Sequence, residues 1–182
     1  MGKAAVIMWC RKKFFKYWRV LVPALLLAAL CRPGPGPAAE AGGGGSVTVP
    51  EEPPLVALTF DDGPRTSTTS RLLDGLALRE IQATFFLVGD WVDKYPESVQ
   101  ALHEAGMEVM NHSNHHDHYN ALSADQIIAD VTACNDKVKA ITGVAPTLIR
   151  CPYGEYDDHV ISAIRSMGME PIQWDVEPPA AE

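Results

Sequence analysis

The sequence contains few cysteines, and none of them forms the Cys-x-x-Cys pair that marks a zinc ribbon, so this class of domain is excluded. Of the four cysteines in the 182 residues, Cys10 and Cys31 lie in the N-terminal segment, which leaves Cys134 and Cys151 for the rest of the chain. Two lone buried thiols are favoured there, with a single disulfide as the alternative.

An apolar run long enough to cross a membrane comfortably is also absent. The run from Val20 to Leu30 is about half the length of roughly 20 residues that a span requires. It follows a basic stretch and precedes a segment rich in proline, glycine and alanine, which is the order of an export signal. We therefore expect residues 1–41 to be a signal peptide, or a signal anchor that holds the protein at a membrane, and residues 42–54 to be a Gly/Pro-rich linker.

Basic residues are scarce outside the expected signal. Residues 42–182 hold eight of the 15 Lys and Arg residues but 22 of the 23 Asp and Glu residues, which gives a formal charge of −14. A field of this sign repels phosphate backbones, so the composition argues against nucleic-acid binding. The expected location is the cell envelope or the extracellular space, and the sequence gives no indication of the oligomeric state.

Apolar runs alternate with helical patterns from Leu55 onward, which is typical of an α/β fold built from βα units. We expect strands at 55–60, 83–88, 108–111, 147–150 and 170–176, and helices at 70–79, 96–105, 123–143 and 157–167. Crossovers of this kind build an open parallel sheet or a barrel. A closed barrel needs about eight units, so five units predict an open sheet or a barrel that is cut short.

Three of these strands end in chemically active side chains. Asp61 and Asp62 follow the first strand, His112 and His116 follow the third, and Arg150 follows the fourth. The carboxyl ends of parallel strands meet at one edge of the sheet, where such folds keep their sites. Two histidines and a carboxylate that leave open positions describe a catalytic divalent-metal site. The alternatives are that the two aspartates only form the turn before Gly63-Pro64, or that His115 and His118 are the ligating pair.

Three motifs carry a family resemblance. The segments TFDDGP at 59–64, His-Ser-x-x-His at 112–116 and Arg-x-Pro-x-Gly at 150–154, in this order, resemble the polysaccharide deacetylases of the NodB-homology family, carbohydrate esterase family 4. The segment ATFFLVG at 83–89 also matches. The resemblance implies that residues 55–182 form a NodB-homology domain, a distorted βα-barrel that is C-terminally truncated and has about five βα units.

The resemblance assigns a role to each residue of the proposed metal site. Asp62, His112 and His116 would bind the metal, which is usually zinc in this family, with cobalt or another divalent ion as alternatives. Asp61 would be the general base that takes a proton from the metal-bound water. Arg150 would hold Asp61 by a charge-assisted pair and keep it ionised.

Two further residues of the resemblance concern the substrate. The backbone N–H of Tyr153 would donate to the oxyanion, and Tyr153 would also contact the sugar. Trp174 is a candidate substrate contact, with packing in the core as the favoured alternative. Beyond Trp174 the chain departs from the family, because the expected Asp-Trp pair and the Leu-x-His segment, whose histidine is the general acid, do not follow. Loss of one acid–base catalyst lowers turnover by something like 10² to 10⁴.

The predicted function is metal-dependent removal of N-acetyl groups from envelope polysaccharide. The substrate would be N-acetylglucosamine or N-acetylmuramic acid units of peptidoglycan, or a chitin-type oligomer. The alternative is a truncated homologue that binds metal and glycan with weak turnover or none. A hydrolase of another amide or of an O-acetyl ester would use the same residues.

Overall fold

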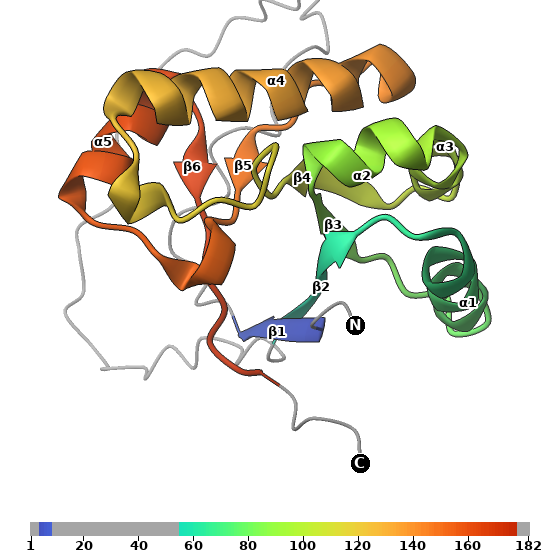
Figure 1. Cartoon of the computed structure of the whole chain (residues 1–182). Coiled ribbons are helices and arrows are strands. Elements are labelled where there is room, and N and C mark those ends of the chain that lie inside the picture. The colour runs from blue at the N-terminus through green and yellow to red at the C-terminus, as the bar shows by residue number, and fades with distance from the viewer. Residues whose placement is uncertain (1–3, 9–54, 178–182) are drawn as a thin grey trace, which may run out of the picture. The chain divides into compact units, whose positions relative to one another are not determined.

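The computed structural model describes residues 4–8 and 55–177, and Figure 1 shows a sheet with helices packed along it. Five parallel strands stand in sequence order: β2 (Val56–Gly63), β3 (Thr84–Leu87), β4 (Glu108–Asn111), β5 (Leu148–Ile149) and β6 (Glu170–Pro171). Each connection therefore moves one place across the sheet, as in a βα-barrel. The predicted α/β class is confirmed.

A sixth strand, β1 (Ala4–Met8), pairs antiparallel with β2, with Ala4 opposite Phe60 and Met8 opposite Val56. We did not predict this strand, because five residues inside a segment with the features of an export signal are too few to show a strand period. The remainder of the expected signal 1–41 and the whole of the expected linker 42–54 lie outside the described residues.

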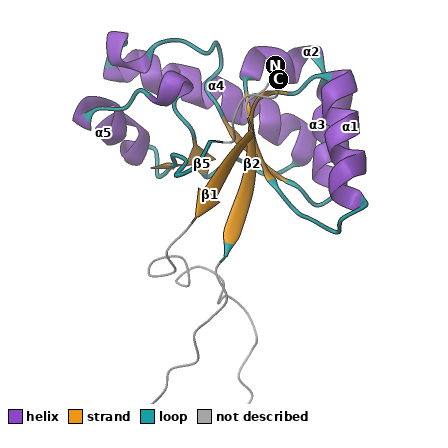
Figure 2. Ribbon diagram, turned by 90° about the horizontal axis from the view of Figure 1, so that it is seen from below, coloured by secondary structure: helices purple, strands orange, loops and turns teal. Residues whose placement is uncertain are grey.

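The helices form an arc around the strands (Figure 2). They are α1 (Thr66–Ala77), α2 (Gly89–Lys94), α3 (Pro96–Glu104), α4 (Ala124–Thr142) and α5 (Asp158–Ser166). Helix α1 packs on α3, α3 on α4, and α4 on α5, while α2 also contacts α4. Within the described residues, none of the helices has the length and apolar character that a membrane crossing needs.

Helix α4 begins and ends where the sequence predicts. Ser123 Oγ accepts a hydrogen bond from the Gln126 backbone N–H, and the Gln126 side chain accepts one from the Ser123 N–H, so the two residues form a capping box. Gly143 ends the helix with φ at 76°, a left-handed conformation that glycine adopts without strain. These local contacts fix both ends of the helix that contributes the most buried side chains to the core.

The core consists of two clusters of buried apolar side chains that α4 joins. Cys134 and Val138 of α4 pack with side chains of α1, β3 and α3, whereas Ile127 and Val131 pack with side chains of β5 and α5. Cys134 and Cys151 are both free and buried, which confirms the prediction of two lone thiols. One helix therefore stabilises both halves of the parallel sheet.

Four elements differ from the prediction, and the first is β2, which continues to Gly63 instead of ending at residue 60, so that Asp61 and Asp62 lie within the strand. Helix α1 starts at Thr66 rather than 70, with the Thr69 hydroxyl accepting from the Arg65 backbone N–H in the first turn. Helix α2 was not predicted, because six residues are too few to show a helical period. Within the expected strand 170–176, only β6 pairs with β5, because β5 itself has just two residues to pair with it.

Candidate metal centre

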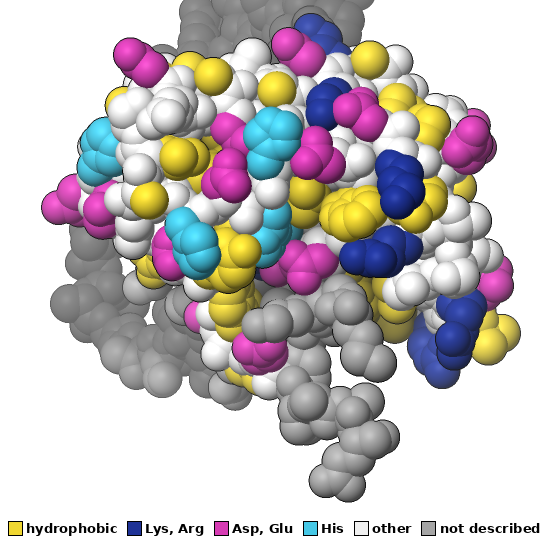
Figure 3. All heavy atoms as spheres, viewed as in Figure 1, with side chains coloured by type: hydrophobic (Ala, Val, Ile, Leu, Met, Phe, Trp, Pro, Cys, Tyr) yellow, Lys and Arg dark blue, Asp and Glu magenta, His cyan; other side chains and the backbone are white. Residues whose placement is uncertain are grey.

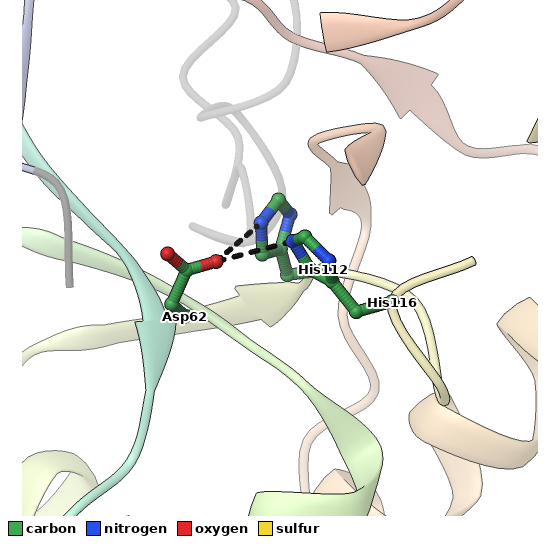
Figure 4. Close-up of side chains that lie close together, drawn as sticks. All are labelled: Asp62, His112 and His116. Carbon is green, nitrogen blue, oxygen red and sulfur yellow. Dashed lines mark ion pairs between the residues drawn. The ribbon is translucent and has the colours of Figure 1, made fainter. Parts of the chain in front are cut away.

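Three side chains that the sequence singles out converge at the carboxyl edge of the sheet (Figure 4). Asp62 stands near the end of β2, and His112 and His116 stand in the loop that follows β4. One carboxylate oxygen of Asp62 lies 3.3 Å from His112 Nε2 and 3.2 Å from His116 Nε2. The three potential ligand atoms all lie within 4.8 Å of one another. The structure thus brings the predicted ligands together, and not His115 or His118.

The backbone at this edge adopts conformations that only glycine adopts readily. Among the described residues other than glycine, φ is positive at Asp62 (64°), Ser113 (68°), His116 (62°) and Tyr153 (59°), and elsewhere only at Glu80. Each such residue carries a conformational cost that the surrounding contacts must offset. Four of the five lie in the three predicted motifs, so the strain is concentrated where the side chains converge.

His112 is oriented by a hydrogen bond from its other ring nitrogen. Its side chain is 4% exposed, and Nδ1 lies 2.7 Å from the Arg150 carbonyl oxygen. A carbonyl can only accept, so Nδ1 carries a proton and donates to it, and Nε2 is the ring nitrogen that faces Asp62. This is the outer contact that metal-ligating histidines usually make.

The Asp62 side chain is a negatively charged carboxylate in this cluster. Hydrogen bonds from His112 and His116 lower the pKa of the Asp62 carboxyl far below its ordinary value, against the opposing effect of burial. An anionic oxygen and two imidazole nitrogens, one of them with its tautomer fixed, are donors that suit zinc and similar divalent ions. The residues present therefore fit the metal that the sequence predicts.

Asp61 lies beside the three ligands and is paired with a fully buried arginine. Arg150 Nη1 donates to Asp61 Oδ1 over 2.7 Å and to Thr59 Oγ1 over 2.9 Å. Burial raises the pKa of Asp61 above its ordinary value, and the charges of His112 and Arg150 oppose that rise. The predicted pair is present, although its effect on the Asp61 pKa is smaller than the effect of burial.

Two residues that were not predicted from the sequence position the loop that carries the histidines, through hydrogen bonds to its backbone. The Asp130 carboxylate, from α4, accepts the backbone N–H groups of Asn114 (2.8 Å) and His115 (3.2 Å) and the Tyr119 hydroxyl (2.7 Å). The side-chain oxygen of Asn111 accepts the Ser113 N–H over 2.6 Å. Asp130 falls at a buried position of α4, and an acidic residue on that face is the sequence signal that could have identified it.

Tyr153 and Trp174 lie at the other side of the cluster. Tyr153 is 57% exposed, and its ring meets His116 edge-on at 4.6 Å and stacks on His118 at 4.0 Å. Trp174 is partly buried, with its ring 5.6 Å from the Arg150 guanidinium carbon. Both predicted substrate contacts are therefore near the cluster, and Trp174 is not a buried core residue.

Comparisons with known proteins identify the family. The polysaccharide deacetylase profile matches residues 48–172. The peptidoglycan-N-acetylmuramic acid deacetylase PdaC of Bacillus subtilis is 39% identical over 131 residues, which cover 72% of this chain and 27% of PdaC. This chain thus corresponds to only a minor part of that relative's length.

Solved structures agree with the sequence comparison. A family 4 carbohydrate esterase from Streptomyces lividans, solved in complex with acetate, matches with a TM-score of 0.62 and 35% identity over 65% of this chain and 61% of the esterase. A family 4 pseudoenzyme from Bacillus anthracis matches with a TM-score of 0.61 and 28% identity over 64% of this chain and 41% of the pseudoenzyme. The sheet order, the three motifs and these matches agree that the chain belongs to the polysaccharide deacetylases, the NodB-homology proteins of carbohydrate esterase family 4.

Proposed function

We propose that this chain is a metal-dependent hydrolase that removes N-acetyl groups from a cell-envelope polysaccharide. The observation that carries the proposal is the cluster of Asp62, His112 and His116 with the carboxylate of Asp61 beside it. Its relative PdaC, named as a peptidoglycan deacetylase, supports peptidoglycan as the substrate class. The basic and apolar segments within residues 1–41 support export, and they could also hold the protein at a membrane.

The proposed metal would be held by Asp62, His112 and His116, with zinc as the favoured ion. When bound, a divalent ion lowers the pKa of water toward neutrality and polarises a carbonyl group. Asp61 would accept the proton of the attacking water, because burial raises the pKa of its carboxyl and makes the carboxylate a stronger base than an exposed one.

Arg150 and Tyr153 support this chemistry without exchanging protons. Arg150 fixes the Asp61 carboxylate through the hydrogen bond to Oδ1, so Oδ2 would be the oxygen that accepts a proton from the water. The backbone N–H of Tyr153 is proposed to donate to the oxygen that gains negative charge when the acetamide carbonyl is attacked. The left-handed backbone at Tyr153 is the structural feature that supports this role.

A metal-binding homologue with little or no turnover is the second candidate. Arg150 Nη2 is buried and has no hydrogen-bond partner in the described part of the chain. The exposed histidines near the cluster are engaged elsewhere, His115 with Asp90 and His118 with Glu155. Neither is placed as a free general acid for the leaving amine, and the matched pseudoenzyme shows that such a fold exists without activity.

A deacetylation assay separates the two candidates. We expect the zinc-loaded protein to release acetate from N-acetylated peptidoglycan fragments, and Asp61→Asn to lower that rate by about 10² to 10⁴, the effect of one acid–base catalyst. Zinc content, measured on both proteins, should be equal. Equal acetate release by the two proteins would exclude the hydrolase and leave the metal-binding homologue.

A further inference from the structure

A hollow of about 390 Å³ opens directly beside the metal ligands. Asp62 and His116 form one wall of it, and the others are formed by residues that the proposed chemistry does not use: Arg65, Val88, Asp90, Trp91 and His115. This volume lies within the range of sites that take a small ligand. Figure 3 shows that histidine, acidic, hydrophobic and basic side chains gather on this face of the molecule. A sugar whose acetamide reaches the ligands would place its other substituents here.

Arg65 brings positive charge to the wall of the hollow, and Lys94, which does not line it, contacts the same Trp91 ring. The Arg65 guanidinium carbon lies 4.6 Å from the centre of the Trp91 ring, and Lys94 Nζ lies 5.0 Å from it. Lys94 also lies 5.5 Å from the centre of the Tyr95 ring. A flat aromatic face attracts a cation and limits the positions that its long side chain samples. Trp91 therefore limits the positions of the Arg65 side chain at the hollow.

Arg65 differs from the other charged side chains of the hollow because it forms no ion pair with the residues that the structure describes. Asp90 is paired with His115 at 3.0 Å and lies 3.8 Å from Lys137, while Asp62 is paired with His112 and His116. Within residues 55–177, by contrast, no carboxylate oxygen forms an ion pair with Arg65. The hollow consequently offers an exposed guanidinium to a ligand, and a guanidinium matches the two oxygens of a carboxylate.

We propose that Arg65 binds a carboxylate on the sugar that is deacetylated, so that the chain prefers an acidic N-acetyl sugar to a neutral one. This inference rests on the proposed function. In N-acetylmuramic acid the lactyl ether stands on the ring carbon next to the one that bears the acetamide. A single hollow beside the metal ligands is therefore able to take both groups. The lactyl carboxylate is free in glycan without stem peptides, and stem peptides carry carboxylates of their own.

Four matched substrates test the role of Arg65. They are a neutral N-acetylglucosamine oligomer, peptide-free peptidoglycan strands with free lactyl carboxylates, the same strands with these carboxylates converted to methylamides, and strands that keep their stem peptides. We expect the wild type to show a kcat/KM about tenfold or more higher on the free carboxylate than on its methylamide, as a charge-assisted hydrogen bond implies. High activity on the strands with stem peptides instead would locate the bound carboxylate in the peptide.

The variant Arg65→Ala should lower kcat/KM by about 10- to 100-fold on the preferred carboxylated substrate and leave the two neutral substrates nearly unchanged. Arg71→Ala is the matched control, because Arg71 is an exposed arginine of helix α1, which begins directly after Arg65, and does not line the hollow. An equal loss on all four substrates, or a wild type that does not prefer a carboxylated substrate, would overturn the inference.

A binding measurement keeps this inference separate from the proposed hydrolysis. The Kd of the zinc-loaded protein for peptide-free strands and for their methylamides is measured by calorimetry, with wild type and Arg65→Ala. A weaker Kd of the variant for the carboxylated strands alone supports the carboxylate site, whether or not acetate is released. Equal Kd values for the two proteins contradict it. Absence of acetate release from all substrates would contradict the proposed function instead.

Discussion

The pairing of Asp61 with Arg150 sets the charge state of the proposed base at the scale of single residues. Burial raises the Asp61 pKa, and Arg150 opposes this rise from a distance of 2.7 Å. Removing the guanidinium by Arg150→Met should therefore raise the Asp61 pKa further. At any given pH a smaller fraction of Asp61 is then ionised, so the acidic limb of the profile of kcat/KM against pH should move to higher pH.

The pH–rate profile of Arg150→Met checks this expectation, with Arg165→Met as the control. Arg165 forms its ion pair with Glu170 on the surface, so its removal should leave the profile in place. Breaking the buried pair should also lower the free energy of unfolding by about 3–5 kcal/mol, so the rates are measured well below the melting temperature. An acidic limb that stays at the wild-type pH would show that Arg150 does not set the Asp61 pKa.

The sequence predicts which residues form the site better than it predicts the backbone conformations and contacts that position them. The five side chains lie at or just after the carboxyl ends of strands that meet at one edge, so their convergence can be predicted from strand order alone: Asp61, Asp62, His112, His116 and Arg150. The left-handed backbone conformations within the three motifs cannot be predicted from the residue types, because aspartate, serine, histidine and tyrosine mostly adopt other conformations. The support from Asp130 depends on a contact across the fold that no local pattern carries.

At the scale of elements, the loop between β4 and α4 depends on one buried carboxylate. Asp130 accepts two backbone N–H groups of this loop and the hydroxyl of Tyr119. In Asp130→Asn one of the accepting oxygens becomes an NH₂ donor and faces another donor. We expect the free energy of unfolding to fall by about 1–3 kcal/mol and the zinc Kd to rise, because the histidine loop loses its fixed position.

Tyr119→Phe is the matched variant for this test. It removes a single hydrogen bond to Asp130 and leaves both backbone contacts in place, so the loss of stability should be about 1 kcal/mol and the zinc Kd should stay near that of the wild type. Chemical denaturation and zinc titration measure both quantities. If Asp130→Asn binds zinc as tightly as Tyr119→Phe, the carboxylate stabilises the fold and does not position the ligands.

Element boundaries were predictable wherever a capping residue fixes them. Ser123 and Gly143 bound α4 through hydrogen bonds and a left-handed φ that depend on those residue types. The boundaries of α1 and β6 depend instead on neighbours: the run of threonine and serine that starts α1 has a weak helical preference, and β6 extends only where β5 pairs with it. Helix α2 has one and a half turns, which is too short for a period.

At the scale of the whole molecule, the proposed metal would connect parts of the sheet that the backbone does not join directly. Asp62 comes from the end of β2 and the two histidines from the loop after β4, with β3 between these strands. An ion bound by all three side chains stabilises only the folded state, because the unfolded chain does not hold these ligands together. Zinc at about 100 times its Kd should therefore add about 2.7 kcal/mol to the free energy of unfolding.

Thermal unfolding with zinc and with a chelator measures this stabilisation, and the expected rise in Tm is on the order of 10 °C for a domain of this size. His112→Ala should abolish the rise, whereas His115→Ala should keep it, because His115 lies in the same loop but pairs with Asp90 and is not one of the three potential ligands. If zinc raises the Tm of His112→Ala as much as that of the wild type, the ion binds elsewhere on this histidine-rich loop, and the cluster of Asp62, His112 and His116 is not the metal site.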